Sequence, residues 1–231
     1  EKKLSALLRK LCEMDFRWIR LHYLYPDEID DELIDTIAEE PKILKYLDIP
    51  IQHCNDQVLA AMNRRNTKEE LLELFYTLRG RIEGLVLRTS LITGLPYEDE
   101  AAFDELCAFL SEVCIERAGV FPYSPEEGTA AAKMPERVDT AEAERRAELV
   151  VDVQSRVMDA FNDSRMGEVV EVLCEGFDGQ SMSYVGRSYA ESPDIDGRIY
   201  FSAEEDVDPG QFVFVRITDV MDGELMGVME E

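Results

Sequence analysis

The sequence predicts an α/β layer with a parallel sheet, followed by a small five-stranded β-barrel. Up to residue 138, apolar strand-like runs alternate with helical patterns, which is typical of βαβ units and a parallel sheet. After Gly167 the helical patterns stop, and five short strands follow, as in a barrel of the oligonucleotide-binding type. The predicted division is therefore residues 1–138, a connecting helix within 139–166, and residues 167–231.

Four strands and five helices are expected in the first part. The strands are "WIRLHYL" (18–24), "LKYLDIPI" (44–51), "LVLRTSLIT" (85–93) and "AGVFPYS" (118–124). The helices are 5–14, 29–39, 56–62, 68–79 and 100–113, the second of them behind a Pro-Asp turn. In such sheets, ligands bind at the carboxyl ends of the strands.

The connecting segment reads as one long amphipathic helix. Asp139 offers an acidic N-cap with Glu142 three residues on, and Gly167 lies just past the expected end near residue 162. An apolar stripe at helical spacing predicts a packing face, formed by Val150, Val153, Val157 and Phe161.

The last part contains strands only. They are "EVVEVLCE", "SYVGRS", "GRIYFS", "QFVFVRITDV" and "ELMGVM". Turn signals separate them, at Asp178-Gly179, Asp196-Gly197, Asp208-Pro209-Gly210 and Asp222-Gly223. We expect an antiparallel barrel.

Composition predicts a globular protein of the cytoplasm. The 231 residues are 45% hydrophobic, without a run of 18 or more apolar residues and without a signal-like start. The five cysteines are odd in number and form no C-x-x-C pair, which predicts reduced thiols and no metal site in this chain.

Charge argues against direct RNA binding, and the lack of a long apolar run predicts no membrane partner. The formal net charge is −26, and residues 167–231 alone hold three Arg, no Lys and sixteen Asp or Glu, a net of −13. Such a barrel repels phosphate and attracts a basic protein, unless the charge serves only solubility. The candidate contacts are Glu191, Asp194 and Asp196, whose alternative role is to cap turns.

Three polar turns fall at the same edge of the expected sheet. Gln52 and His53 follow the second strand, Thr93-Gly94 the third, and Tyr123-Ser124-Pro125 the fourth. They can converge on one ligand, although a lone histidine such as His53 is more often structural. Arg88 lies inside an apolar strand, so its guanidinium needs a carboxylate, from the protein or from a ligand.

Four ordered motifs resemble the radical SAM methylthiotransferases over nearly the whole chain. They are "YLDIPIQHCNDQVLAAMNRRNT", "VLRTSLITGLPYEDEAAFDEL", "GVFPYSPEEGTAAAKM" and "VGRSYAESPDIDGRIYF". The text around Gln52-His53 and residues 192–197 is similar to the branch that modifies a ribosomal protein, and differs from the tRNA branch.

The resemblance implies a partial TIM-type barrel, a terminal TRAM domain, S-adenosylmethionine and two [4Fe–4S] clusters. The implied reaction adds a methylthio group to the β-carbon of an aspartate in small-subunit ribosomal protein number twelve. It places Gln52 and His53 near the sulfonium, Arg88 at the methionyl carboxylate, and Thr93-Gly94 at the adenine. Tyr97 departs from the family pattern, which has glycine there.

The cluster cysteines of that family would lie upstream of this chain, which therefore resembles the second half of the enzyme, a truncation that is expected to be inactive by itself. An open edge at the strand of Trp18, with uncovered apolar residues, would then favour self-association. The alternatives are a tRNA-modifying enzyme of the same family and a non-enzymatic interaction module.

Overall fold

The computed structural model describes residues 3–135 and 137–230, which form two compact units dividing between Val157 and Met158. We call them the N-terminal and C-terminal units and describe each by itself. Within the described residues, no helix combines the length and apolar character needed to cross a bilayer.

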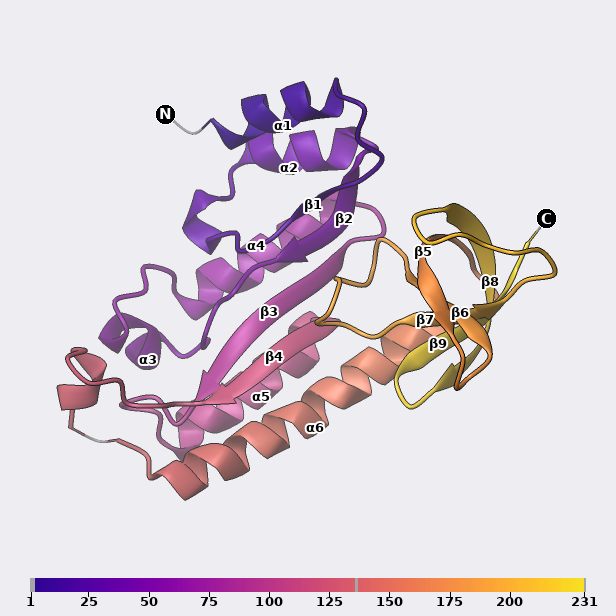
Figure 1. Cartoon of the computed structure of the whole chain (residues 1–231). Coiled ribbons are helices and arrows are strands. Elements are labelled where there is room, and N and C mark those ends of the chain that lie inside the picture. Colours follow the sequence, from indigo (N-terminus) through magenta and orange to yellow (C-terminus); the bar gives the residue numbers. More distant parts are fainter. Residues whose placement is uncertain (1–2, 136, 231) are drawn as a thin grey trace. The chain divides into compact units, whose positions relative to one another are not determined.

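The N-terminal unit contains a four-stranded parallel sheet in the order β1-β2-β3-β4, as predicted (Figure 1). The strands are β1 (Ile19–Leu21), β2 (Ile43–Asp48), β3 (Val86–Thr93) and β4 (Arg117–Pro122). The pairing of Tyr46 with Val86 is parallel, which confirms the βαβ interpretation. β1 is shorter than expected and lies at one end of the strand order.

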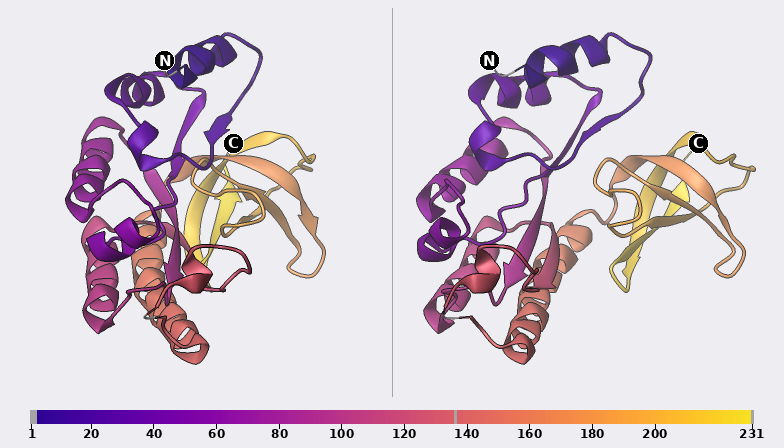
Figure 2. Two further views of the ribbon diagram at one scale, coloured as in Figure 1. Left: turned by 90° about the vertical axis from the view of Figure 1, so that its left-hand side faces the viewer. Right: turned by 60° about the vertical axis from the view of Figure 1, so that its left-hand side comes forward.

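Helices cover one face of this sheet (Figure 2). They are α1 (Leu4–Cys12), α2 (Asp31–Glu39), α3 (Asp56–Ala61), α4 (Lys68–Arg81) and α5 (Glu100–Val113). Side chains Asp30, Asn55, Thr67 and Asp99 accept hydrogen bonds from the first turns of α2, α3, α4 and α5. Two short 3₁₀ helices, Pro26–Glu28 and Ala131–Lys133, complete the unit.

The core lies between the sheet and these helices. Alternate strand residues such as Leu47, Ile49, Leu87 and Leu91 join one buried cluster with Phe75 and Phe109. Their neighbours on β2 and β3 must point to the other face, because side chains alternate along a strand. That face carries Tyr46, Asp48 and Arg88, which are also buried.

α6 (Thr140–Ser164) runs across the boundary between the two units. The Asp139 carboxylate accepts a hydrogen bond from the Ala141 amide, so the predicted N-cap is confirmed. Val150 is fully buried in the core of the N-terminal unit, and Val153 packs against it. The first part of the predicted stripe is therefore a packing face of that unit.

The first turn of α6 holds an ion-paired carboxylate. Glu142 accepts hydrogen bonds from Arg145 Nε at 2.7 Å and from Arg146 Nε at 2.8 Å. These two partners lower the pKa of Glu142 from 4.5 to about 2. Because the folded-state pKa is depressed, this stabilisation is complete above pH 4.5 and disappears as the pH falls to about 2.

We expect Glu142→Gln to remove this pH dependence. The difference in the free energy of unfolding between wild type and variant should be constant above about pH 5.5 and should shrink between pH 4.5 and about 2. Urea unfolding at pH 6, pH 4 and pH 3 measures it. A difference that stays the same at all three values would show that hydrogen bonding, and not charge, stabilises the turn.

The C-terminal unit is a closed barrel in the order β5-β6-β7-β9-β8 (Figure 1). Its strands are β5 (Val169–Asp178), β6 (Ser183–Arg187), β7 (Ile199–Ser202), β8 (Phe212–Met221) and β9 (Glu224–Met229). All five were predicted, but β7 and β9 pair in parallel, so the barrel is not purely antiparallel. Gly186 and Gly227 allow close strand approach, since an added Cβ would lie 2.4 Å from Leu173 O or Val215 Cγ1.

Candidate functional site

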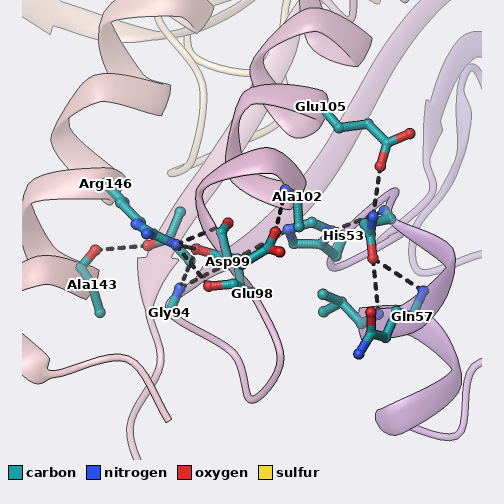
Figure 3. A network of polar contacts seen from close by, with 12 residues as sticks. His53, Gln57, Gly94, Glu98, Asp99, Ala102, Glu105, Ala143 and Arg146 are labelled. Atoms are coloured by element: carbon teal, nitrogen blue, oxygen red, sulfur yellow. Dashed lines mark hydrogen bonds and ion pairs between the residues drawn. The ribbon is translucent and has the colours of Figure 1, made fainter. Parts of the chain in front are cut away.

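The predicted site residues lie near the carboxyl end of the sheet, but they separate into three places. Gln52 lines a hollow. Arg88 is in a buried ion pair. His53, Thr93 and Gly94 lie around a buried network and α6 (Figure 3). The expectation that they surround one cavity is therefore corrected, and each place is described in turn.

Glu98 is the centre of the buried network (Figure 3). Its side chain is fully buried, and the Gly94 amide donates to both of its carboxylate oxygens at 2.9 Å. Arg146 Nη1 on α6 donates to Glu98 Oε1 and to the Glu98 carbonyl, each at 2.9 Å. One carboxylate thus connects the end of β3, the start of α5 and the side of α6.

His53 joins this network from the end of β2. The imidazole is fully buried, and its Nδ1 accepts a hydrogen bond from the Asn55 amide at 2.9 Å. That bond assigns the proton to Nε2, which lies 3.4 Å from Glu98 Oε2. Its burial and these contacts are those of the structural alternative for His53.

Asn55 and Glu105 extend the polar contacts beyond His53 (Figure 3). Asn55 Nδ2 donates to Glu105 Oε2 at 2.7 Å, and Lys68 Nζ donates to Glu105 Oε1 at 3.0 Å. Burial alone would raise the pKa of Glu105, but these two bonds lower it. Buried Cys54 nearby has its pKa raised to about 12 by desolvation, which makes it a poor nucleophile.

Thr93 and Gly94 contact α6. Thr93 Oγ1 donates to the Ala143 carbonyl at 2.8 Å. Gly94 has φ +78, and a Cβ added there would lie 2.3 Å from Ala143 Cβ. The absence of a side chain at Gly94 is thus explained by the helix, and the physical argument for a close adenine contact at this residue no longer holds.

Tyr97 occupies the turn between Gly94 and Glu98 with φ +67. This left-handed conformation favours glycine, which is the residue expected here from the family pattern. The Glu98 amide donates to the Leu95 carbonyl at 3.0 Å, which closes the turn. The Tyr97 side chain lines a hollow at the start of α5.

Arg88 pairs with a protein carboxylate. Its Nη1 lies 3.0 Å from Asp48 Oδ2, and both side chains are buried on the face opposite the helices. His22 Nδ1 lies 3.5 Å from the same oxygen. The prediction that Arg88 needs a carboxylate is confirmed, and Asp48 supplies one.

Gln52 lies at a hollow of about 330 Å³ at the carboxyl end of the sheet. We call it the strand-end hollow; its polar lining comes from Tyr23, Tyr25, Gln52, Arg64 and Ser90. Backbone bonds hold Gln52 in place, since its amide donates to Ser90 O and its carbonyl accepts from Ile92 N, both at 2.9 Å. Of the five predicted cofactor residues, Gln52 is the one placed at this hollow.

Sequence reasoning missed Glu98 and Arg64. The spacing of Gly94 and Glu98 was a usable signal, because a carboxylate four residues after a strand-end glycine can return to its amide. Arg146 gave no local signal, since it lies 48 residues further along the chain. Arg64 stood inside a quoted motif, but nothing near it in the sequence indicated a hollow.

In the C-terminal unit, the expected partner contacts differ in exposure. Glu191 is almost fully buried, with Oε1 2.5 Å from Arg165 Nη1 and Oε2 2.6 Å from Ser188 Oγ. Asp196 accepts a hydrogen bond from the Ser192 amide at 2.8 Å and so caps the turn. Asp194 is exposed. The predicted partner contact through Glu191 is therefore wrong, because its carboxylate is already paired inside the unit.

Two domain models match the chain in order. The model described as the radical SAM superfamily matches residues 1–110, and the model described as the TRAM domain matches residues 166–229. The solved structure of coproporphyrinogen III oxidase (HemN) from Escherichia coli, described as a radical SAM enzyme, has a TM-score of 0.55 at 20% identity. It covers 67% of this chain and 37% of its own, which supports the fold alone.

Curated relatives match the chain from end to end. Ribosomal protein uS12 methylthiotransferase RimO of Clostridium novyi is 43% identical over 99% of this chain and 51% of the relative. The protein of the same name from Acetivibrio thermocellus is 42% identical over 98% of this chain and 50% of the relative. The chain thus spans about half the length of these relatives. With a partial radical SAM barrel and a TRAM barrel in that order, it belongs to the radical SAM methylthiotransferase family.

Proposed function

We propose that the chain is part of a methylthiotransferase that adds a methylthio group to the β-carbon of an aspartate in ribosomal protein uS12. The observation that carries this proposal is the end-to-end identity with relatives named for that activity, across both domains. The acidic C-terminal unit disfavours the tRNA alternative, because phosphate would be repelled.

The strand-end hollow fits part of S-adenosylmethionine. It lies where α/β sheets bind ligands, and it offers aromatic, amide and hydroxyl groups from Tyr23, Gln52 and Ser90 to a nucleoside. We propose that these three residues hold the cofactor and keep its sulfonium away from water. When bound and reduced, the cofactor supplies the radical that removes an unactivated C–H hydrogen.

The two [4Fe–4S] clusters of the proposal need thiolate ligands. Within residues 3–135 and 137–230, no three His, Cys, Asp or Glu side chains are placed together to hold a metal. The ligands of the proposed clusters would therefore not come from these residues. What the described residues contribute is the sheet, the strand-end hollow and the TRAM barrel.

The test uses the full-length protein with both domains and its upstream segment. After anaerobic reconstitution, it is incubated with S-adenosylmethionine, a sulfide source, a reductant and purified uS12. We expect a methylthio adduct on one aspartate by mass spectrometry. A protein that binds uS12 without modifying it would instead support the interaction module, and modification of tRNA alone would change the substrate.

We further propose that the acidic barrel accelerates encounter with the basic substrate, in the cytoplasm, where the protein would act. Asp194→Lys in the full-length protein is expected to lower the association rate with uS12, and the effect should fade as salt rises. Glu83→Lys, an exposed residue of the N-terminal unit, makes the same charge change as a control. Equal slowing by both variants would show that only total charge matters.

Self-association through the edge of β1 is also a proposal. β1 is at one end of the strand order, and exposed Phe16 precedes it along the chain. Exposed strand edges tend to pair with other chains. Concentration-dependent sedimentation of this chain would support it, and a single monomer species at all concentrations would contradict it.

A further inference from the structure

Two hollows meet at one arginine near the carboxyl end of the sheet. The strand-end hollow shares Tyr25, Pro50 and Arg64 with a second hollow of about 520 Å³. We call the second one the loop hollow; its lining includes Asp27 and Glu28 from the loop after β1 and extends along residues 62–66. Among the residues shared by the two hollows, Arg64 alone carries a charge.

Arg64 is held in place without a carboxylate. Its guanidinium carbon lies 5.7 Å from the centre of the Tyr25 ring, a cation–π distance that fixes the direction of the group. Its backbone amide donates to the Leu59 carbonyl at 2.9 Å. Over the part of the chain that the structure describes, no acidic side chain forms an ion pair with it.

This lack of an ion pair occurs in a chain that is rich in acidic residues. Asp and Glu outnumber Lys and Arg by 50 to 24, so acidic partners are plentiful. Four other arginines, Arg79, Arg88, Arg146 and Arg165, each contact a carboxylate. A half-buried guanidinium that lines a hollow and keeps its donors available has the chemistry of an anion-binding group.

Three residues that line the two hollows have a strained backbone conformation. Tyr23 has φ +59, Gln52 has φ +71 and Asn63 has φ +55, all in the left-handed region. Tyr23 and Gln52 line the strand-end hollow, and Asn63 lines the loop hollow directly before Arg64. Non-glycine residues in this region are held there by their surroundings and cluster at binding sites.

We propose that Arg64 binds a carboxylate at the junction of the two hollows. The proposal rests on the proposed function, which brings two carboxylates to this end of the sheet: the methionyl end of the cofactor and the side chain of the aspartate that is modified. Arg88, in contrast, already has a protein carboxylate, Asp48, as its partner. The planar guanidinium suits a bidentate contact, with Tyr25 supporting its face.

The experiment compares ligands with and without the carboxylate on the full-length protein. Calorimetry measures binding of S-adenosylmethionine against its decarboxylated form. A second arm measures binding of a uS12 peptide with aspartate or asparagine at the modified position. Wild type, Arg64→Met and Arg64→Lys are compared with Arg156→Met, which removes one exposed positive charge from α6.

We expect wild type to prefer the carboxylate form about 10-fold or more in one of the two arms. Arg64→Met should reduce that preference to about one, Arg64→Lys should retain part of it, and Arg156→Met should leave it intact. The affected arm identifies the source of the carboxylate. If Arg64→Met fails to fold, Arg64→Lys still tests the proposal, because lysine keeps the positive charge but lacks the paired donors of the planar guanidinium.

Two results would overturn the proposal, and they are distinguishable. If wild type binds both ligands and neither preference changes in Arg64→Met or in Arg64→Lys, the role of Arg64 is wrong while the proposed function stands. If wild type binds neither S-adenosylmethionine nor the peptide, the proposed function fails, and the role of Arg64 fails with it.

Discussion

Glu98→Ala is expected to lower the free energy of unfolding of the N-terminal unit by about 3–5 kcal/mol. The substitution removes the buried acceptor of Arg146 Nη1 and of the Gly94 amide, while Glu142 and Glu100 still contact the other nitrogens of Arg146. Each buried donor that loses its acceptor keeps its desolvation penalty, which is about 1–3 kcal/mol for a neutral group and more for a charged one. Urea unfolding of the whole chain, followed by a probe in the N-terminal unit, measures the loss.

Glu142→Ala is the matched control, because Glu142 is a second carboxylate on the same arginine. Arg146 Nε donates to it at 2.8 Å, but Glu142 faces solvent and is much more exposed than Glu98. Water can replace an exposed partner, so the loss should be much smaller. Equal losses in the two variants would show that Arg146 depends on charge alone, and that the burial of Glu98 contributes nothing.

Local patterns in the sequence were sufficient for the architecture. The alternation of strands and helices predicted four parallel strands, and Asp-Gly and Pro-Gly turns predicted the five strands of the barrel. These signals act over a few residues, through side-chain periodicity and turn geometry. The parallel pairing of β7 with β9 was missed because it depends on how the barrel closes, which no turn between neighbouring strands specifies.

The candidate site was harder to predict, because it depends on pairs that are distant in sequence. The cost of burying a guanidinium correctly predicted a carboxylate partner for Arg88. The identity of that partner could not be predicted, because Asp48 lies 40 residues away in the sequence and a ligand carboxylate fitted the sequence equally well. Glu191 stood in an acidic loop that looked exposed, and only the fold brings Arg165 to it. Family position suggested an adenine contact at Gly94, where the structure instead shows a helix contact.

Gly94→Ala is expected to have the second large effect, a loss of about 2–5 kcal/mol in the free energy of unfolding. Two penalties add at this residue. The new Cβ would lie 2.3 Å from Ala143 Cβ and 3.1 Å from Ala143 Cα, so α6 must move away from the end of β3. In addition, φ +78 is unfavourable for any residue with a side chain.

Gly128→Ala separates the two penalties. Gly128 has φ +87, and a Cβ added there meets nothing within 4 Å, so only the backbone penalty of about 1–2 kcal/mol applies. The excess loss in Gly94→Ala then measures the contact with Ala143. Movement of α6 would also lengthen the bond from Thr93 Oγ1 to the Ala143 carbonyl and the bond from Arg146 to Glu98. We therefore expect faster amide hydrogen exchange in the first turns of α6 in Gly94→Ala but not in Gly128→Ala, and identical exchange in the two variants would show that β3 and α6 are not coupled through this glycine.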